Sequence, residues 1–136
     1  MNTFHEGESL YWTIRPTGPD NLPVLLGTPI ASNPGPTTTV TSWSLYLYDE
    51  DSATPTATVY ELLDQNPQGS FFTSLVLDTY WGDLDEKGYS ARFTVPGSGF
   101  TSVGGHTYRL ELVITTPNFG LLVEQELIQC VGRYSA

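Results

Sequence analysis

Apolar and polar residues alternate most regularly between residues 105 and 131, close to the end of the chain. The apolar members of the first run are Tyr108, Leu110, Leu112 and Ile114. Charged residues such as Arg109 and Glu111 stand between them, so we expect a strand with one face in the core and the other in solvent. Turn-forming residues at 117–120 separate this run from a second one that ends at Val131. The two runs therefore predict a long β-hairpin, on which the rest of the chain packs.

The second run of the hairpin has a less regular pattern. Val123, Leu127 and Val131 share their parity with Gln125 and Gln129. Two interpretations stay open: a bulge shifts the alternation, or this strand is only half covered and lies near a sheet edge.

Shorter runs with the same period of two precede the hairpin. They cover residues 10–14, 24–26, 37–48, 56–63, 71–78 and 89–95. In the run 37–48 the apolar positions shift near Thr41 and Ser42, which suggests a bulge. Residues 1–9 are polar, and we expect them to be loose. Seven or eight strands without a helical pattern predict an all-β fold, either a sandwich of two antiparallel sheets or a small barrel.

Length and proline content add two expectations about organisation. A chain of 136 residues predicts one domain, 1–136, with a single core. Residues 17–39 hold five of the ten prolines, which are Pro19, Pro23, Pro29, Pro34 and Pro36. Because proline lacks the N–H that a sheet requires, we expect this segment to form an extended loop or arm.

The charge balance is strongly acidic and excludes several partners. Five Lys and Arg stand against 15 Asp and Glu, which gives a formal net charge of −10. Nucleic-acid binding requires cations that replace counterions on phosphates, and an anionic membrane repels such a chain. The sequence has no apolar run of 18 residues and no secretory signal at its start, so we expect synthesis in a cytoplasm and no membrane partner.

The pattern does not assemble a catalytic or metal-binding group. The acidic clusters are Asp49, Glu50 and Asp51 in one predicted loop and Asp83, Asp85 and Glu86 in another. Neither has the spacing of a Ca²⁺-binding EF-hand, so we expect solvated charges, and the alternative is that the oxygens of either loop bind a cation. His5, His106 and Cys130 lack the further ligands that zinc requires, and the lone Cys130 has no disulfide partner in the chain. We expect a turn position for His106, a strand thiol at Cys130, and no enzyme activity, metal or cofactor.

Aromatic side chains remain as candidates for contact with a partner or ligand. They are Trp81 with Tyr80, and Tyr46 with Tyr48. Trp12 and Trp43 have the parity of core residues, whereas Trp81 lies in a predicted loop. We expect Trp81 to cap the sandwich or to lie at a subunit contact, and the alternative is a platform on which a sugar ring stacks.

Three segments share a pattern with a known group of proteins. They are Glu-Gly-Glu-Ser-Leu-Tyr-Trp-Thr-Ile at 6–14, Asp-Glu-Lys-Gly-Tyr-Ser-Ala-Arg-Phe-Thr-Val at 85–95, and Gly-His-Thr-Tyr-Arg-Leu-Glu-Leu-Val-Ile at 105–114. With the second hairpin arm, they resemble the small immunoglobulin-like modules of tailed-phage virions. The pair formed by Asp85 and Tyr89, four residues apart, is similar to the tyrosine corner of immunoglobulin folds. Ala91 stands where the second core cysteine would be, so the resemblance implies an immunoglobulin-like antiparallel β-sandwich without an intersheet disulfide.

The same resemblance implies a non-enzymatic structural protein of a phage virion. The first expectation is a capsid decoration (cement) protein that binds the capsid surface, and the alternative is a neck or tail-attached module. The implied partners are the major capsid protein or neck proteins, in a homo-oligomer such as a trimer. The implied location is the virion, after synthesis in the host cytoplasm. Outside this family, the residues leave open a carbohydrate-binding β-sandwich that uses Trp81.

Overall fold

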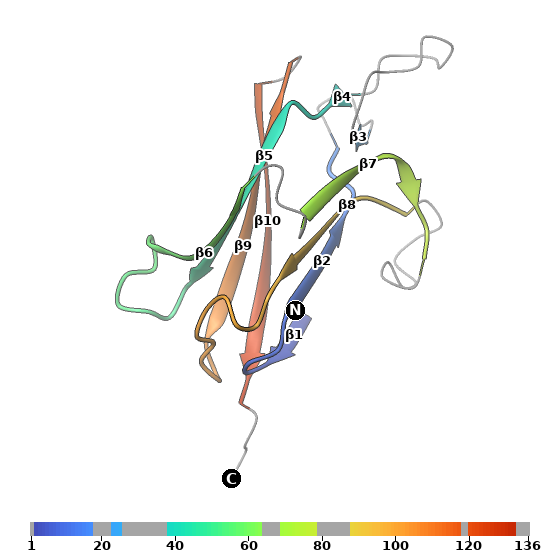
Figure 1. The fold of residues 1–136 in the computed structure, drawn as a ribbon. Helices are drawn as coiled ribbons and strands as arrows, with labels where there is room; N and C mark the ends of the chain where they lie inside the picture. Colours follow the sequence, from blue (N-terminus) through green and yellow to red (C-terminus); the bar gives the residue numbers. More distant parts are fainter. Residues whose placement is uncertain are drawn as a thin grey trace, which may run out of the picture.

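The computed structural model describes residues 2–17, 23–25, 38–63, 69–78, 88–117 and 120–132, and these ranges fold into strands without a helix (Figure 1). The strands are β1 (Asn2–His5), β2 (Leu10–Ile14), β3 (Val24–Leu25), β4 (Thr38–Thr39), β5 (Ser42–Asp49), β6 (Thr58–Leu63), β7 (Gly69–Val76), β8 (Tyr89–Val95), β9 (Thr107–Thr116) and β10 (Gly120–Val131). The all-β prediction is therefore confirmed, and the described ranges hold more strands than the seven or eight expected. No helix in these ranges is long and apolar enough to cross a membrane.

Two sheets face each other across the core (Figure 1). The large sheet has the strand order β1-β10-β9-β5-β6, and the small sheet has the order β2-β8-β7. A third pair, β3-β4, lies at one end of the small sheet. The β1–β10 and β3–β4 pairs are parallel and the other pairs are antiparallel, so the expectation of purely antiparallel sheets is wrong for these two pairs.

The core is formed by alternate side chains of both sheets, as the period of two predicts. The fully or nearly fully buried side chains include Leu45, Leu47, Leu110, Leu112 and Ile114 of the large sheet and Leu10, Trp12, Ala91, Phe93 and Val95 of the small one. Phe93 lies at the centre, with ring centroids 5.0 Å from Trp43, 5.9 Å from Phe71 and 6.1 Å from Trp12. Gly69, the first residue of β7, lies against this cluster. A Cβ there would lie only 2.6 Å from Trp43 and 2.7 Å from Phe93, so a larger residue would not fit without movement of these rings.

The hairpin prediction is confirmed, and the structure decides between the two interpretations of its second strand. β9 and β10 pair without a register shift from Gly120↔Thr116 to Gln129↔Thr107. The alternation is therefore unbroken, and β10 is only half covered. Its partner strand β9 has the fully regular pattern of buried and half-buried residues that the sequence predicts.

The turn before β9 is built by glycine. His106 N–H donates to Val103 C=O at 3.1 Å, and Gly105 has a φ of 89°, which fits glycine at the third position of a type II turn. Gly105 N–H donates to Cys130 C=O and Cys130 N–H donates to His106 C=O, so two residues oppose one. This arrangement is a G1 bulge at the far end of the hairpin, and it sets the register there.

Residues 2–5 form a strand, so the expectation of a loose stretch at residues 1–9 is wrong for this described part of it. β1 pairs with Ile128–Val131 of β10, and Glu6 N–H donates to Val131 C=O at 3.0 Å. Phe4 is buried, with its ring centroid 5.7 Å from that of Tyr108 and 6.4 Å from that of Phe100. One buried aromatic residue and a four-residue strand give too short a pattern for the period of two to be recognised.

The run at 37–48 is divided between two sheets. This change of sheet near Thr41, and not the expected bulge, accompanies the shift in the apolar positions. Val40 N–H donates to Leu25 C=O beside the small pair, whereas Thr41 N–H donates to Thr115 C=O of the large sheet. In the proline-rich segment 17–39, Val24 is fully buried and its N–H donates to Pro16 C=O at 2.8 Å. This part is attached to the core, and residues 18–22 and 26–37 lie outside the described ranges.

Candidate interaction surface

The side of the large sheet that faces away from the small sheet, here called the outer face, carries the uncovered side chains. Exposed aliphatic residues gather on it at both edges. On β10 they are Leu121, Val123, Leu127 and Val131, exposed by 65%, 53%, 45% and 39%, and on β6 they are Val59 and Leu63. On β5 and β9, the residues that alternate with the outer-face positions point inward and are nearly all buried. The outer face is therefore the reverse side of strands whose inner side packs in the core.

Registered strands place the outer-face side chains in rows across the sheet. One row contains Glu61, Tyr46, Glu111 and Gln125. The next contains Tyr48, Arg109 and Leu127, and on the other side lie Leu63, Ser44, Val113 and Val123. A polar row with one tyrosine therefore separates an aliphatic row from a row with a tyrosine and an arginine.

Tyr48 and Arg109 form the most tightly built part of the outer face. The Arg109 guanidinium carbon lies 4.5 Å from the Tyr48 ring centroid, and Arg109 Nε lies 3.2 Å from Glu50 Oε1. Burial raises the pKa of Tyr48, the Glu111 carboxylate raises it further, and Arg109 opposes this. The Tyr46 and Tyr48 rings have centroids 6.5 Å apart. Tyrosine and arginine held in this way are typical of protein interfaces, because they offer large contact areas with a polar tip.

Two of the four predicted aromatic contact residues, Tyr46 and Tyr48, therefore lie together on the outer face. Trp81 and Tyr80 lie outside the described residues. A hollow of about 570 Å³ lies beside Arg109 and is lined by Glu50, Thr107, Arg109, Gln125, Glu126 and Leu127. The pattern of Val123, Leu127 and Val131 predicted a half-covered strand near a sheet edge, but it did not predict that these aliphatic residues face outward together.

The acidic loop at 49–51 is fastened to the start of β9, and the expectation of solvated charge is wrong for Asp49. The Asp49 side chain is only 8% exposed, and its two carboxylate oxygens lie 2.8 and 3.0 Å from His106 Nδ1. Asp51 N–H donates to Asp49 at 3.0 Å, and Thr107 N–H donates to Asp51 at 2.7 Å. These bonds hold a loop against a turn, and within the described ranges no three His, Cys, Asp or Glu side chains gather as a metal site.

Cys130 is a buried strand thiol, as predicted, 1% exposed. Burial raises its pKa, and a hydrogen bond with Ser102 opposes that rise. A thiol with a raised pKa is a poor nucleophile at neutral pH.

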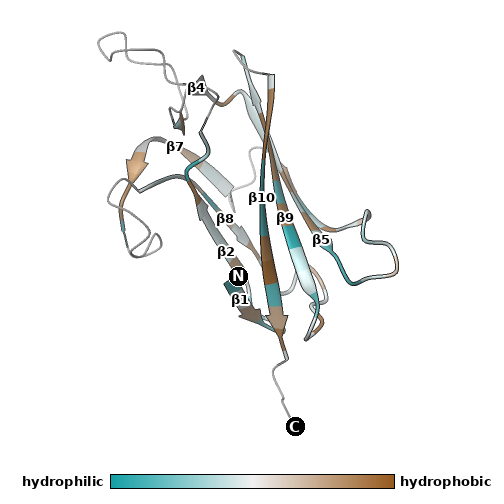
Figure 2. Cartoon of the chain, turned by 180° about the vertical axis from the view of Figure 1, so that it is seen from behind, coloured by the Kyte–Doolittle hydropathy of each residue, from teal (hydrophilic) through white to brown (hydrophobic). Residues whose placement is uncertain are grey.

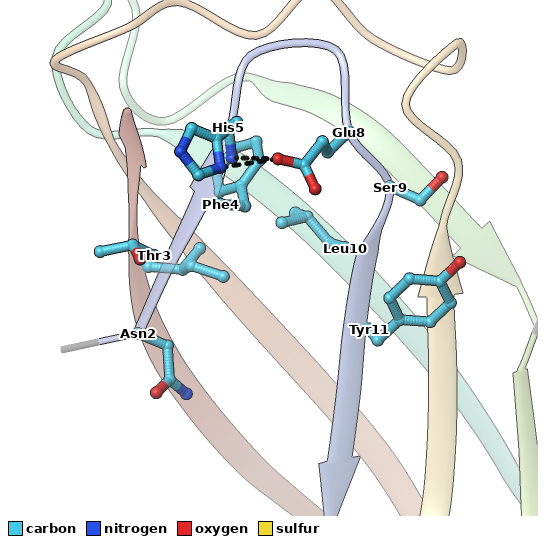
Figure 3. A pocket seen from close by; sticks show the side chains of 9 residues that line it. Asn2, Thr3, Phe4, His5, Glu8, Ser9, Leu10 and Tyr11 are labelled. Atoms are coloured by element: carbon cyan, nitrogen blue, oxygen red, sulfur yellow. Dashed lines mark hydrogen bonds and ion pairs between the residues drawn. The ribbon is translucent and has the colours of Figure 1, made fainter. Parts of the chain in front are cut away.

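A second hollow, also of about 570 Å³, lies between β1 and β2, where the edges of the two sheets meet (Figure 3). His5 Nδ1 lies 2.7 Å from Glu8 Oε1, and the His5 N–H donates to the same oxygen at 3.2 Å. Phe4 and Leu10 supply buried apolar surface below these polar groups. Since His5 and Glu8 are already bonded to each other across the loop, the geometry supports a role in closing the sandwich edge.

Comparisons with protein-family models, curated proteins and solved structures gave no match to this chain.

Proposed function

We propose that the chain is a non-enzymatic structural protein of a phage virion, a capsid decoration protein that binds the capsid surface through its outer face as part of a homo-oligomer. The observation that carries the proposal is the outer face itself, on which exposed aliphatic residues flank Tyr46, Tyr48 and Arg109. Exposed apolar patches rimmed by polar groups mark protein interaction sites. The net charge of −10 would keep many copies soluble and apart before assembly.

The proposal includes an immunoglobulin-like arrangement of the strands, as in the virion modules that the sequence resembles. In such folds one sheet holds strands G, F and C, extended by C′ in the variable type, and the other holds B, E and D. The orders β10-β9-β5-β6 and β2-β8-β7 correspond to G-F-C-C′ and B-E-D when the strands are named in chain order. β1 would then take the position of a short strand beside G.

A second feature supports the same arrangement and moves the tyrosine corner to another residue. Tyr108 lies at the start of β9, and its hydroxyl accepts a hydrogen bond from Val103 N–H at 2.9 Å, five residues upstream. A tyrosine at the start of strand F that bonds upstream backbone is the tyrosine corner. The Tyr89 hydroxyl donates to the Asp78 carboxylate at 2.8 Å, and Asp85, with which the sequence suggested a corner at Tyr89, lies outside the described residues. Leu110, not Ala91, then stands two residues after the corner, at the cysteine position.

The test is quantitative mass spectrometry of purified particles encoded by the same genome. A decoration protein is expected at a fixed copy ratio to the major capsid protein, and immunogold labelling is expected on the capsid shell. Labelling only at the neck or tail would instead favour the alternative module. Absence of the chain from purified particles would refute the whole proposal.

A binding experiment tests the surface. Particles lacking the chain are mixed with purified protein, and the double variant Leu63→Glu with Tyr46→Ala is expected to lose binding. Leu77→Glu is the matched control, because Leu77 is 57% exposed but follows β7 in the small sheet. Equal binding by both variants would show that the outer face is not the contact.

The carbohydrate-binding alternative stays a prediction. One face of the Tyr48 ring is occupied by Arg109, which leaves less of it for stacking with a sugar. No observation on the described surface favours this alternative over protein contact.

A further inference from the structure

The edge of β10 is paired over only part of its length. β1 pairs with Ile128–Val131, and no other strand in the described ranges pairs with residues 120–127 on that side. Figure 2 shows β1 beside the lower part of β10 only. The upper part is eight residues long, which corresponds to roughly 27 Å of extended chain. We call residues 120–127 the open edge.

The direction of the backbone groups along the open edge follows from bonds at its lower end. Cys130 exchanges hydrogen bonds with Gly105 and His106 on the β9 side, whereas Val131 C=O accepts from Glu6 N–H on the β1 side. Neighbouring residues of a strand direct their N–H and C=O groups to opposite sides, and β10 has no register shift against β9. The odd-numbered residues Leu121, Val123, Gln125 and Leu127 therefore direct N–H and C=O toward the open edge.

The side chains of this stretch are sorted in an unusual way. The odd-numbered residues lie on the outer face and are mostly aliphatic, with Leu121, Val123 and Leu127 exposed by 45–65%. The inward-facing positions hold two carboxylates, Glu124 and Glu126, both half-buried. Burial raises the pKa of Glu124, and Asn2 Nδ2 lies 3.4 Å from Glu126 Oε1. A strand that turns aliphatic residues outward and carboxylates inward is suited to a neighbour with the complementary alternation.

We propose that the open edge is a strand-addition site for an extended segment of a partner protein in which aliphatic residues alternate with lysine or arginine. The backbone of that segment bonds the edge-directed groups of the odd-numbered residues. Its aliphatic side chains extend the stripe of Leu121, Val123 and Leu127 on the outer face. Its cations lie on the inner side beside Glu124 and Glu126, where burial strengthens the attraction.

A second copy of the same edge fits less well. Antiparallel pairing of two β10 edges around a twofold axis at Glu124 places Glu124 opposite Glu124, and a shift of the axis by one residue places Glu124 opposite Glu126. Like charges directly opposite each other destabilise a strand pair. The net charge of −10 on each copy adds to this repulsion and favours a basic partner.

The open edge exists whether or not the chain belongs to a virion, so this inference does not rest on the proposed function. The probe is a capped eight-residue peptide of alternating lysine and valine, titrated into the full chain and followed by amide hydrogen exchange in NMR spectra. Without peptide, the edge-directed amides of Leu121, Val123, Gln125 and Leu127 are expected to exchange fast, and those of the residues between them slowly. Peptide is expected to slow the odd-numbered amides selectively. A matched peptide of alternating glutamate and valine is expected to leave them unchanged.

A pair of variants at one position separates strand addition from plain charge attraction. Gln125→Pro removes one edge-directed N–H but no bond to β9, and proline is tolerated where a strand edge faces solvent. Gln125→Ala keeps the N–H and equally loses the side-chain bond from Gln125 to Glu111. We expect Gln125→Pro to bind the lysine–valine peptide about tenfold more weakly than Gln125→Ala, with unchanged circular dichroism for both.

The remaining outcomes are decisive in either direction. A double variant, Glu124→Gln with Glu126→Gln, is expected to bind about tenfold more weakly and with a smaller salt dependence, while keeping the alternating exchange pattern. Equal peptide affinity of Gln125→Pro and Gln125→Ala would overturn the proposal, and so would peptide protection confined to other residues. Without peptide, protection of the odd-numbered amides that increases with protein concentration would identify a second copy of the chain as the occupant. That outcome would also overturn the proposal.

Discussion

Replacing Tyr108 with phenylalanine tests whether the Tyr108 hydroxyl at the start of β9 stabilises the fold. The Tyr108 ring is fully buried, with its centroid 5.7 Å from that of Phe4 and 5.6 Å from that of Phe100, and phenylalanine keeps these contacts. The substitution removes the hydrogen bond from Val103 N–H to the Tyr108 hydroxyl, which contributes about 1 kcal/mol. We expect the free energy of unfolding to fall by about 1–2 kcal/mol.

The assay is urea unfolding followed by tryptophan fluorescence at neutral pH. The melting temperature is expected to fall by about 3–7 °C. Tyr11→Phe is the control, because Tyr11 is 63% exposed, and it should change the free energy of unfolding by less than about 0.5 kcal/mol. A Tyr108→Phe protein within that same margin of the wild type would refute the reasoning.

The same variant carries a pH dependence. Burial raises the pKa of Tyr108 to about 12, and Asp49 adds to this rise while the bond from Val103 opposes it. Because the pKa in the folded state lies above the ordinary value of 10.0, the neutral hydroxyl is favoured in the fold. This contribution to stability is complete below pH 10 and is lost as the pH rises through about 12. The wild-type protein should therefore lose more stability than Tyr108→Phe across this interval, and parallel pH profiles would contradict the assignment.

Three further substitutions probe the core and the loop clamp. Gly69→Ala places a Cβ 2.6 Å from Trp43 and 2.7 Å from Phe93, so thermal melting should report a loss of about 1–3 kcal/mol, and a neutral effect would mean that these rings move easily. Phe93→Ala should cost about 3–5 kcal/mol in urea unfolding, and a loss below about 2 kcal/mol would mean that the core collapses around the cavity. His106→Ala leaves buried Asp49 without its imidazole partner, which should cost about 1–3 kcal/mol and speed amide exchange at 50–51. Unchanged exchange there would show that the pair does not hold the loop.

The parts of the fold that the sequence predicted are those where most inward positions are apolar and most outward positions are polar. β9 is such a strand, and so the hairpin and its buried residues Leu110, Leu112 and Ile114 were predicted correctly. β1 was missed because it is four residues long, pairs in parallel and buries one side chain, Phe4. An alternation of apolar and polar residues can be recognised only over several periods, and short strands do not supply them.

The candidate site was predicted only in part, for two physical reasons. Tyr46 and Tyr48 follow from parity, because their neighbours Leu45 and Leu47 are buried. The burial of Asp49 depends on His106, which is 57 residues away in sequence, and no local pattern carries that information. The outward position of the aliphatic residues on β10 was not predicted, since apolar side chains are ordinarily assigned to the core.

The sorting of side chains on β10 has a consequence for folding. A slip of β10 by one residue against β9 would turn Leu121, Val123 and Leu127 inward. The same slip would turn Glu124 and Glu126 outward. In this half of the strand, hydrophobic burial alone therefore does not disfavour the slipped register. The native register must therefore be selected elsewhere, at the open end of the hairpin, where Ile128 and Cys130 are buried and the glycine turn before β9 bonds Cys130. Variants that disturb that turn are expected to fold into mixtures of registers, even where the native contacts they remove are few.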